Sequence, residues 1–413
     1  MSQPSKSFGA LSDIRILDLT QMLAGPYATM MLADHGAEVI KIEGMGGDIT
    51  RLAGPFAGDD RQQTHGGYFQ SVNRNKQSVC LNLKAEAGHA AFLELVKTAD
   101  VVVENFRHGV MDRLGLSYES LRAANPALVY GALRGFGDRR TGASPYADWP
   151  AFDVVAQAMG GIMGITGPDA RAPTKVGPGV GDIIPGMMLS FGILAAVHHA
   201  RRTGQGQFVD VSMVDSVLAT CERMIYQYSV QGRVAEPEGN HHPFICPFGM
   251  FPASDGFITI AAPQDSFFAT LCEKIGAPHL LDDARFATAG ERVANKAELI
   301  GLLSGLTSAF TKAELSERLG GLIPFGPVLR MDEIEADRHF AIREMLVEVE
   351  QPGSAHKTRI AGVPLKMTGT PGAVRRRGPY LGEDTVAVLA RAGLGGDEIQ
   401  RLLDQGAALQ HSN

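Results

Sequence analysis

The sequence predicts an α/β protein that has a large domain with a mostly parallel sheet and a smaller domain in the second half of the chain. Over roughly the first 140 residues, short apolar segments alternate with segments of helical periodicity. This pattern is typical of parallel strands joined by crossover helices. The length of 413 residues is too great for one ordinary domain. Residues 231–247 have little periodicity and contain Gly, Pro and Asn, which indicates a linker or exposed loop.

The first predicted unit is a strand, a helix and a second strand within about 30 residues, the size expected of a parallel crossover. Residues 14–19 form a short, mostly apolar run, Pro26 suits the first turn of a helix, and Gly36 is a natural helix stop. Residues 38–42 form the next strand. The same alternation predicts helices at 85–98 and 118–124 and strands at 100–104 and 127–133.

Glycine is dense between residues 151 and 190, which allows backbone to approach a ligand or another segment closely. The elements predicted after it are a helix at 184–203 closed by Gly204, a strand at 208–213, a helix at 214–228, hairpin strands at 249–253 and 257–261, and helices at 383–392 and 397–404. Thr311 and Glu314 have the spacing of a capping box. We therefore predict a large domain over 1–230, a small domain over 231–322 and a return to the large domain over 323–413.

The composition excludes several classes of protein. With 38 Lys and Arg against 45 Asp and Glu, the net charge of −7 leaves no overall basic field for nucleic acid or an anionic membrane. An anionic ligand would need a local basic patch. The four cysteines lie far apart with no C-x-x-C spacing, so neither a disulfide framework nor a metal site is predicted. The N-terminus lacks the apolar core of a signal peptide, and the sequence predicts a soluble, cytoplasmic protein.

Common motifs for catalysis are missing from the sequence. No G-x-G-x-x-G follows the first strand, so a nicotinamide-dependent oxidoreductase is suggested only by the α/β pattern. No phosphate loop, H-E-x-x-H or G-x-S-x-G occurs. The histidine pairs at 198–199 and 241–242 are adjacent rather than one helical turn apart, which is a poor arrangement for a metal.

A series of short segments resembles the class III CoA-transferases, the family of formyl-CoA transferase and carnitine CoA-transferase that also includes the α-methylacyl-CoA racemases. The matching segments keep the family's order over nearly the whole chain. They are LDLT at 17–20 with AGP at 24–26, GAEVIKIE at 36–43, GD at 47–48 with TR at 50–51, NK at 75–76 with Ser78, ADVVVENF at 99–106, NP at 125–126, GFG at 135–137, GD at 181–182, and TGQGQ at 203–207 with residues 209–215.

The resemblance implies a large Rossmann-like domain and a small α+β domain joined by two linkers into a ring, with two rings interlocked as a homodimer. It implies a CoA-transferase that moves CoA from an acyl-CoA to a small carboxylic acid. Coenzyme A and acyl-CoA would be substrates, and no permanently bound cofactor is implied.

By the same resemblance, Asp182 corresponds to the family's nucleophilic aspartate. A carboxylate that attacks a thioester forms a mixed anhydride, and the released thiolate then converts it to an aspartyl-CoA thioester. The neighbouring glycines would offer N–H groups to the oxyanion at each step. The alternative interpretation is that Asp182 caps a helix that begins at residue 183 or 184.

CoA carries about four negative charges on its phosphates, and the first domain has candidate cations for them. These are Arg51, Arg74, Lys76, Lys84, Arg107, His108 and Arg113. The CoA contacts assigned by the resemblance are Leu23, Leu81, Asn82, Lys84, Asn105, Phe106, Arg107, Arg113 and Asp153. Phe106 would stack on adenine, while Lys84 and Arg113 would pair with phosphates. For each cation the alternative is a solvated surface charge, and for Asp153 it is a helix cap.

Three departures from the family narrow the activity. Phe152 stands where the racemases have a proton-carrying histidine, so an acyl-CoA racemase is the disfavoured alternative. The glycine run of the oxalate enzymes is missing, and residues 238–243 occupy its place. Pro150 and Gly44 replace a lysine and an arginine of those enzymes, so those two CoA contacts are in doubt. We therefore expect another acid, such as the dicarboxylates succinate or mesaconate.

The loop that replaces the glycine run contains polar side chains suited to a substrate carboxylate. Asn240, His241 and His242 are the candidate residues for acid recognition, together with Phe152. The alternative for this loop is an exposed polar linker.

Overall fold

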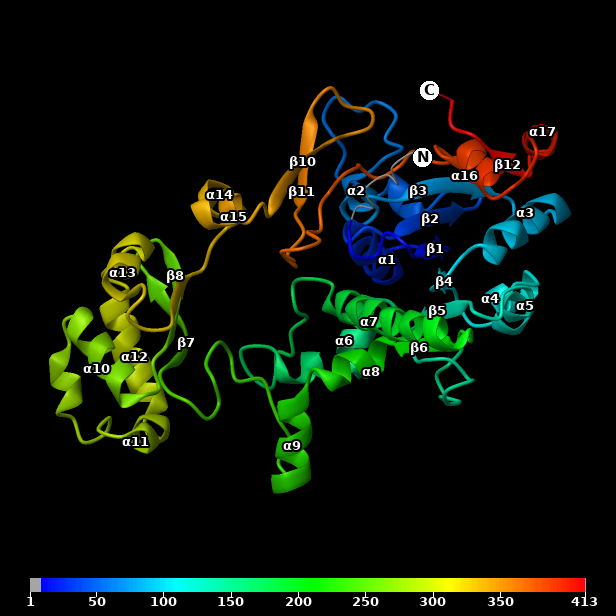
Figure 1. Ribbon diagram of the computed structural model, residues 1–413. Coiled ribbons are helices and arrows are strands. Elements are labelled where there is room, and N and C mark those ends of the chain that lie inside the picture. Colours follow the sequence, from blue (N-terminus) through cyan, green and yellow to red (C-terminus); the bar gives the residue numbers. More distant parts are fainter. Residues whose placement is uncertain (1–8, 413) are drawn as a thin grey trace. The chain divides into compact units, whose positions relative to one another are not determined.

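The computed structural model describes residues 9–412 (Figure 1) and divides into two compact units. The large unit contains the described residues up to 162, residues 176–222 and residues from 338 on. The small unit contains residues 163–175 and 223–337. The chain therefore passes between the units after residues 162, 175, 222 and 337, whereas the sequence predicted boundaries only at 231 and 323.

A seven-stranded sheet forms the centre of the large unit. Its order is β12-β3-β2-β1-β4-β5-β6, and every neighbouring pair is parallel except β12 with β3. The strands are β1 (Arg15–Asp18), β2 (Glu38–Glu43), β3 (Gln77–Leu81), β4 (Val101–Glu104), β5 (Val129–Arg134), β6 (Phe208–Ser212) and β12 (Ala408–Leu409). The order 3-2-1-4-5-6 is that of a doubly wound dinucleotide-binding fold. The predicted α/β class with a mostly parallel sheet is confirmed.

Helices cover both faces of this sheet. One face packs against α3 (Glu86–Lys97), α5 (Tyr118–Ala124), α16 (Thr385–Arg391) and α17 (Gly396–Asp404). The other packs against α1 (Ala24–Asp34) and α7 (Val180–Thr203). The remaining elements of the unit are η1 (Ile49–Leu52), α2 (Gly67–Val72), α4 (Val110–Arg113), α6 (Asp153–Met159), η2 (Ile162–Ile165), α8 (Met213–Ala219), α15 (Arg338–Ile342), β10 (Leu346–Glu350) and β11 (Lys357–Ala361), with η2 at its border.

Helix α7 is long and apolar enough, by length and composition, to cross a membrane. Core helices of globular proteins pass the same test, and α7 packs against α1, β5 and β6. Gly186 permits the contact with α1, because a Cβ there would lie 2.6 Å from the carbonyl oxygen of Ala24.

The start of α7 differs from the prediction. The helix begins at Val180 with Gly179 as its N-cap, one turn before the predicted start at 184. The Asp153 carboxylate accepts a hydrogen bond of 2.8 Å from the Gly181 N–H, so a residue of α6 satisfies an amide that the helix itself leaves open. The periodicity of the sequence carries no sign of this distant partner.

The helix predicted at 214–228 is two helices. Helix α8 ends at Ala219, and α9 (Glu222–Gln231) follows after two residues. The Thr220 hydroxyl donates to the Val217 carbonyl at 2.7 Å, as expected of a residue whose side chain competes for backbone groups.

The small unit has a three-stranded antiparallel sheet of β7 (Phe248–Ala253), β8 (Gly256–Ala261) and β9 (Phe325–Pro327). The predicted hairpin around residues 254–256 is confirmed, and so is the capping box of Thr311 and Glu314. Its helices are α9, most of which lies in this unit, α10 (Asp265–Lys274), η3 (Pro278–Leu281), α11 (Ala289–Ala294), α12 (Lys296–Thr307), α13 (Lys312–Leu319) and α14 (Met331–Ala336).

Candidate active site

A cavity of about 360 Å³ opens at the carboxyl ends of β1, β4 and β5, within the large unit. In a parallel sheet this edge, where the strand order reverses between β1 and β4, is the usual place for a ligand. Its lining includes Met22, Asn105, Phe106, Arg107, His108, Arg134, Trp149, Phe152 and Asp182. Six of these nine were candidate site residues in the sequence, namely Asn105, Phe106, Arg107, His108, Phe152 and Asp182.

Asp182 lies in the first turn of α7 and is half-buried in the cavity wall. None of the described residues donates a hydrogen bond to its carboxylate. Burial, and then the negative charge of Asp153, raises the pKa of Asp182 to about 7. The carboxylate is therefore half-buried and has no hydrogen-bond donor among the described residues, an environment typical of functional carboxylates.

The alternative role for Asp182 as a helix cap is wrong. Gly179 occupies the N-cap position without a side-chain hydrogen bond, and Asp182 lies three residues inside. The Gly181 N–H is bonded to Asp153, so it is not available to an oxyanion. Gly179 lies against Leu23, because a Cβ there would come within 2.9 Å of the Leu23 side chain.

Asp153 is the first residue of α6 and is held on both sides. Its carboxylate accepts from the Gln157 amide at 2.9 and 3.0 Å and from the Gly181 N–H. Asp153 thus caps α7 rather than its own helix. A Cβ on Gly181 would lie 2.5 Å from the Asp153 carbonyl oxygen, which shows how closely α6 and α7 approach.

Tyr68 on α2 lies within the electrostatic field of Asp182 but is not among the residues that line the cavity. Burial raises its pKa to about 12, and the negative charges of Asp182, Asp48 and Asp153 act in the same direction. No sequence pattern links α2 to residue 182, which is 114 residues further along the chain.

The loops after β1 and β4 are joined by the Asn105 side chain. Its amide donates to the Gln21 carbonyl at 2.7 Å and accepts from the Gln21 N–H at 2.8 Å. The next residue, Met22, lines the cavity with a φ of 67°, a left-handed conformation that costs free energy for a side chain of this type. The side chain of the predicted CoA contact Asn105 therefore forms its hydrogen bonds with the loop that makes up the cavity wall.

Three of the candidate cations for CoA are buried in ion pairs, which corrects the predicted basic patch. Lys76 pairs with Asp18 at 2.9 Å, Arg51 with Glu43 at 2.7 Å, and Arg74 with Asp34 at 2.7 Å. All six side chains are shielded from solvent. A buried cation that is already paired has no free donor for a phosphate, so these residues hold the fold rather than a ligand.

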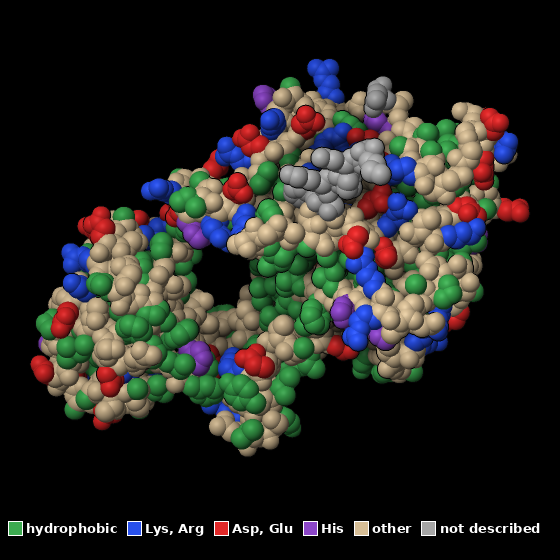
Figure 2. All heavy atoms as spheres, in the orientation of Figure 1, with side chains coloured by type: hydrophobic (Ala, Val, Ile, Leu, Met, Phe, Trp, Pro, Cys, Tyr) green, Lys and Arg blue, Asp and Glu red, His purple; other side chains and the backbone are tan. Residues whose placement is uncertain are grey.

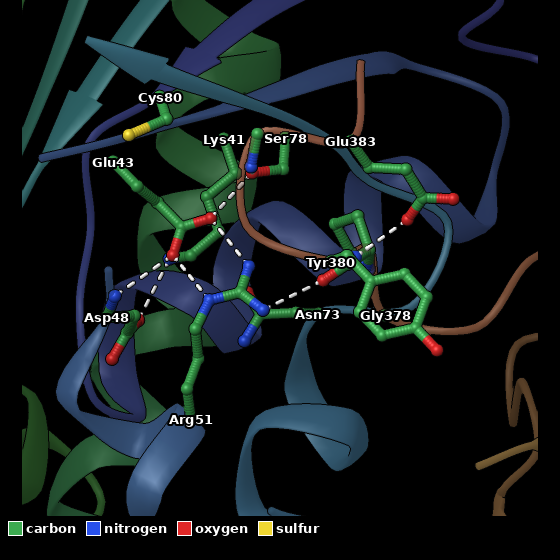
Figure 3. A network of polar contacts seen from close by, with 12 residues as sticks. Lys41, Glu43, Asp48, Arg51, Asn73, Ser78, Cys80, Gly378, Tyr380 and Glu383 are labelled. Carbon is green, nitrogen blue, oxygen red and sulfur yellow. Dashed lines mark hydrogen bonds and ion pairs between the residues drawn. The ribbon is translucent and has the colours of Figure 1, made fainter. Parts of the chain in front are cut away.

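Figure 3 shows the part of this network around Arg51. Arg51 contacts both carboxylate oxygens of Glu43, donates to the Pro379 carbonyl at 2.9 Å, and lies 3.8 Å from the centre of the Phe69 ring. The Ser78 hydroxyl donates to Glu43 and accepts from the Gly382 N–H. The network therefore ties the C-terminal segment to the ends of β2 and β3.

The remaining predicted cations are accessible. Lys84, Arg107 and Arg113 are exposed, and no described acidic side chain pairs with them. Arg107 and His108 line the cavity, and His108 Nδ1 lies 3.9 Å from the Asp148 carboxylate. The role of these four residues as a local basic patch stays a prediction.

The other predicted CoA contacts lie outside the cavity. Leu81 is fully buried in the core beneath α3, so its side chain is not available to a ligand. Asn82 is half-buried and accepts from the Lys84 N–H at 3.2 Å. Leu23 precedes α1 and packs on Gly179 beside the start of α7.

Asn240, His241 and His242 belong to the small unit, not to the cavity of the large unit. The segment is paired with β7, because the His242 N–H donates to the Phe248 carbonyl and the Asn240 carbonyl accepts from Met250. Burial, followed by nearby cations, lowers the pKa of both histidines. Their predicted role in acid recognition stays a prediction.

The arrangement suits covalent acyl chemistry. An unpaired carboxylate stands in the wall of a cavity that aromatic and aliphatic side chains also line, together with the exposed cation Arg107. Among the described residues, no group of three His, Cys, Asp or Glu side chains is placed to hold a metal ion.

Comparison with known protein families gives one match that spans most of the chain. The profile of CoA-transferase family III matches residues 11–385. The chain is 48% identical over 386 residues to the succinyl-CoA:mesaconate CoA-transferase of Haloarcula marismortui, covering 94% of this chain and 97% of that protein. It is 39% identical to the succinate–glutarate CoA-transferase of Agrobacterium fabrum, covering 92% and 95%.

Solved structures give the same result. A CAIB/BAIF family protein from Brucella suis superimposes with a TM-score of 0.84 at 34% sequence identity, covering 93% of this chain and 100% of that one.

Proposed function

Because the chain belongs to CoA-transferase family III, we propose that it moves CoA from succinyl-CoA or a similar dicarboxylyl-CoA to a second small dicarboxylic acid such as mesaconate. It is a CoA-transferase, and its substrates are an acyl-CoA and an organic acid. The choice of dicarboxylates is supported by the names of the relatives, which act on succinate, mesaconate and glutarate or their CoA esters.

The observation that carries the proposal is the unpaired Asp182 carboxylate in the cavity. Its oxygen attacks the thioester carbonyl and forms a mixed anhydride, while CoA leaves as the thiolate. The thiolate attacks the aspartyl carbonyl, which releases the first acid and leaves CoA as a thioester on Asp182. The carboxylate of the second acid attacks this thioester and forms a new anhydride, again releasing the thiolate. The thiolate finally attacks the acyl carbonyl of the second acid, which forms the product and restores Asp182.

Each anhydride and the enzyme thioester must be protected from water. The walls formed by Met22, Trp149 and Phe152 are apolar, and an apolar enclosure also strengthens electrostatic interactions inside it. The Gly181 N–H is not assigned to the oxyanion that forms at each attack, since it is already bonded to Asp153.

We assign the exposed cations Lys84, Arg107 and Arg113, together with the half-buried His108, to the CoA phosphates, and Phe106 to the adenine or the adjoining part of CoA. Free guanidinium and ammonium groups match phosphate oxygens, and each is accessible. Asn240, His241 and His242 are assigned to the acid substrate, with the support that their polar groups lie in a loop of the small unit.

The working form is proposed to be an interlocked homodimer with the two units joined by two linkers. Exposed apolar side chains support an association of this kind. Figure 2 shows hydrophobic atoms gathered over α9. On this helix the Tyr228 side chain is 62% exposed and the Val230 side chain is 79% exposed. On α7, Phe191 is 77% exposed. Light scattering on the purified protein should give twice the mass of 44.0 kDa.

The proposal is tested by incubating the protein with succinyl-CoA and a panel of unlabelled acids and identifying the new CoA esters by mass spectrometry. Asp182→Asn should lower kcat by about a thousandfold or more, because the nucleophile is lost. Asp397→Asn is the matched control, since Asp397 also lies in the first turn of a helix but is fully accessible. Wild-type turnover by Asp182→Asn, or deuterium uptake into an acyl-CoA without transfer, would contradict the proposal and favour a racemase.

A further inference from the structure

A chain of ion pairs runs from the surface to the wall of the cavity. Exposed Glu119 pairs with Arg140 at 2.8 Å, Arg140 with Asp138 at 3.1 Å, and Asp138 with Arg134 at 2.7 Å. Arg134 also pairs with Glu104, whose side chain is completely buried. The chain thus ends at the last residue of β4, directly before the predicted CoA contacts Asn105 and Phe106.

Glu104 and Asn105 each use their side chain to hold a backbone segment of the cavity. The Glu104 carboxylate accepts from the Phe106 N–H at 2.8 Å. The Asn105 amide makes two hydrogen bonds to Gln21, which precedes the strained Met22. The geometry of the crevice between β1 and β4 is therefore set by two consecutive side chains at the end of β4.

Arg134 connects Glu104 to the cavity itself. It lies at the end of β5, lines the cavity, and exposes only 9% of its side chain. Its terminal nitrogens contact Glu104 and Asp138. Asp138 is anchored in turn, because its N–H donates to the Asp210 carboxylate of β6 at 2.9 Å. Arg134 is thus held in place from β4 and, through Asp138, from β6.

We propose that Glu104 and Arg134 are a positioning pair that fixes the loop from Asn105 to His108 in the conformation that binds acyl-CoA. The pair does not touch the reacting atoms and acts through the Phe106 N–H and the shape of the crevice. This inference rests on the proposed function, because it requires CoA to occupy this cavity.

A pair that served stability alone would behave differently. Loss of a buried ion pair lowers the stability of the whole domain, and it has no reason to weaken one substrate more than the other. A positioning pair should instead affect the loop that contacts CoA, while the attack by Asp182 from α7 proceeds at nearly the same rate. The two roles are therefore separated by comparing KM for the acyl-CoA, KM for the acid, and kcat.

The test uses steady-state kinetics of the full-length protein with succinyl-CoA and an accepted acid, together with calorimetric titration of free CoA. Glu104→Gln and Arg134→Met should raise KM for succinyl-CoA and Kd for CoA by about tenfold, the size expected for a lost hydrogen bond to a charged group. KM for the acid and kcat should stay within about threefold of the wild type. The double variant should have a KM for succinyl-CoA no higher than that of the more impaired single variant, because the two residues act as a unit.

Two further variants keep the test decisive. Arg134→Lys retains the charge but cannot span both carboxylates with one ammonium group, so it should fold and still raise KM for succinyl-CoA. Glu119→Gln at the exposed outer end of the same chain should leave both KM values unchanged. The proposal is overturned if the inner variants keep wild-type KM for succinyl-CoA, or if both KM values and kcat change together. A wild-type protein that transfers no CoA would instead overturn the proposed function.

Discussion

Two groups of charged residues in the large unit have opposite character. In the first, which we term the paired region, Asp18, Asp34, Glu43, Arg51, Arg74 and Lys76 are buried and matched in ion pairs. In the second, the open region of Arg107, Arg113 and Asp182, the described residues include no partner for any of the three charged groups. The charges of the paired region thus stabilise the fold, whereas those of the open region are available to a ligand.

The difference follows from the cost of burying charge. A buried ion is tolerated only when its hydrogen-bonding groups are satisfied. Lys76 meets this condition with three acceptors, namely Asp18, Asn73 and the Pro26 carbonyl. The Asp182 carboxylate has no such partner among the described residues, and its pKa is raised because burial disfavours the charged form. An unsatisfied charge in a cavity is therefore a better sign of function than a charge in a well-formed network.

The largest expected effect is on the stability of the paired region. Lys76→Met leaves Asp18 as a buried carboxylate without its ion-pair partner, so we expect the free energy of unfolding to fall by about 3–5 kcal/mol. Urea denaturation followed by circular dichroism measures this change. Lys97→Met is the control, because Lys97 is an exposed lysine paired with Glu94 within α3, and it should cost at most about 0.5 kcal/mol. Equal effects of the two substitutions would remove the distinction between the regions.

The next effect is a pH dependence that belongs to the open region. Asp182 attacks as the carboxylate, and its pKa is raised to about 7. Below that pH the neutral form accumulates, so kcat/KM should fall about tenfold per unit as the solution becomes more acidic. Above it, kcat/KM should reach a plateau. The profile is measured with succinyl-CoA between pH 5 and about 9.

Asp153→Asn tests whether the acidic limb of this pH profile belongs to Asp182. Asparagine keeps an oxygen for the Gly181 N–H but removes the negative charge that helps to raise the pKa of Asp182. The acidic limb should therefore move to lower pH. Asp397→Asn should leave the acidic limb of the kcat/KM profile at the wild-type pH. If Asp153→Asn also leaves it there, the titrating group is not Asp182.

The smallest effect concerns the exposed cations. Arg113→Gln should raise KM for succinyl-CoA by about two- to fivefold at low salt, since an exposed charge contact contributes little. The difference from wild type should shrink as salt is added, because screening weakens the remaining interaction. Arg122→Gln, an exposed arginine on α5, is the control and should have no effect. A KM for Arg113→Gln that matches the control would remove Arg113 from the CoA site.

Local patterns predicted much of the fold correctly. The helix at 118–124 has the predicted bounds, the long helix ends at Gly204 as expected, and Thr311 forms the capping box. These features depend on residues that are close in the sequence. The start of α7 was missed because its amide is bonded to Asp153, which lies 28 residues earlier.

In the candidate site, even more depends on contacts between residues that are far apart in the sequence. The resemblance to a family pointed to Asp182 and Phe106, which both line the cavity, but it could not show that Lys76 and Arg74 are paired with Asp18 and Asp34, 58 and 40 residues away. Nor could it indicate that the charge of Asp182 helps to raise the pKa of Tyr68, 114 residues earlier in the chain. Whether a charge is free or satisfied depends on its partners in space.

The central claim is that Asp182 carries CoA as a thioester during turnover. The most direct measurement is to incubate the protein with succinyl-CoA without an acceptor acid, quench with hydroxylamine, digest, and map the peptides by mass spectrometry. The account predicts a hydroxamate on the peptide that contains Asp182, formed in wild type and absent from Asp182→Asn. A hydroxamate on another carboxylate, with Asp182 unmodified in active enzyme, would contradict it.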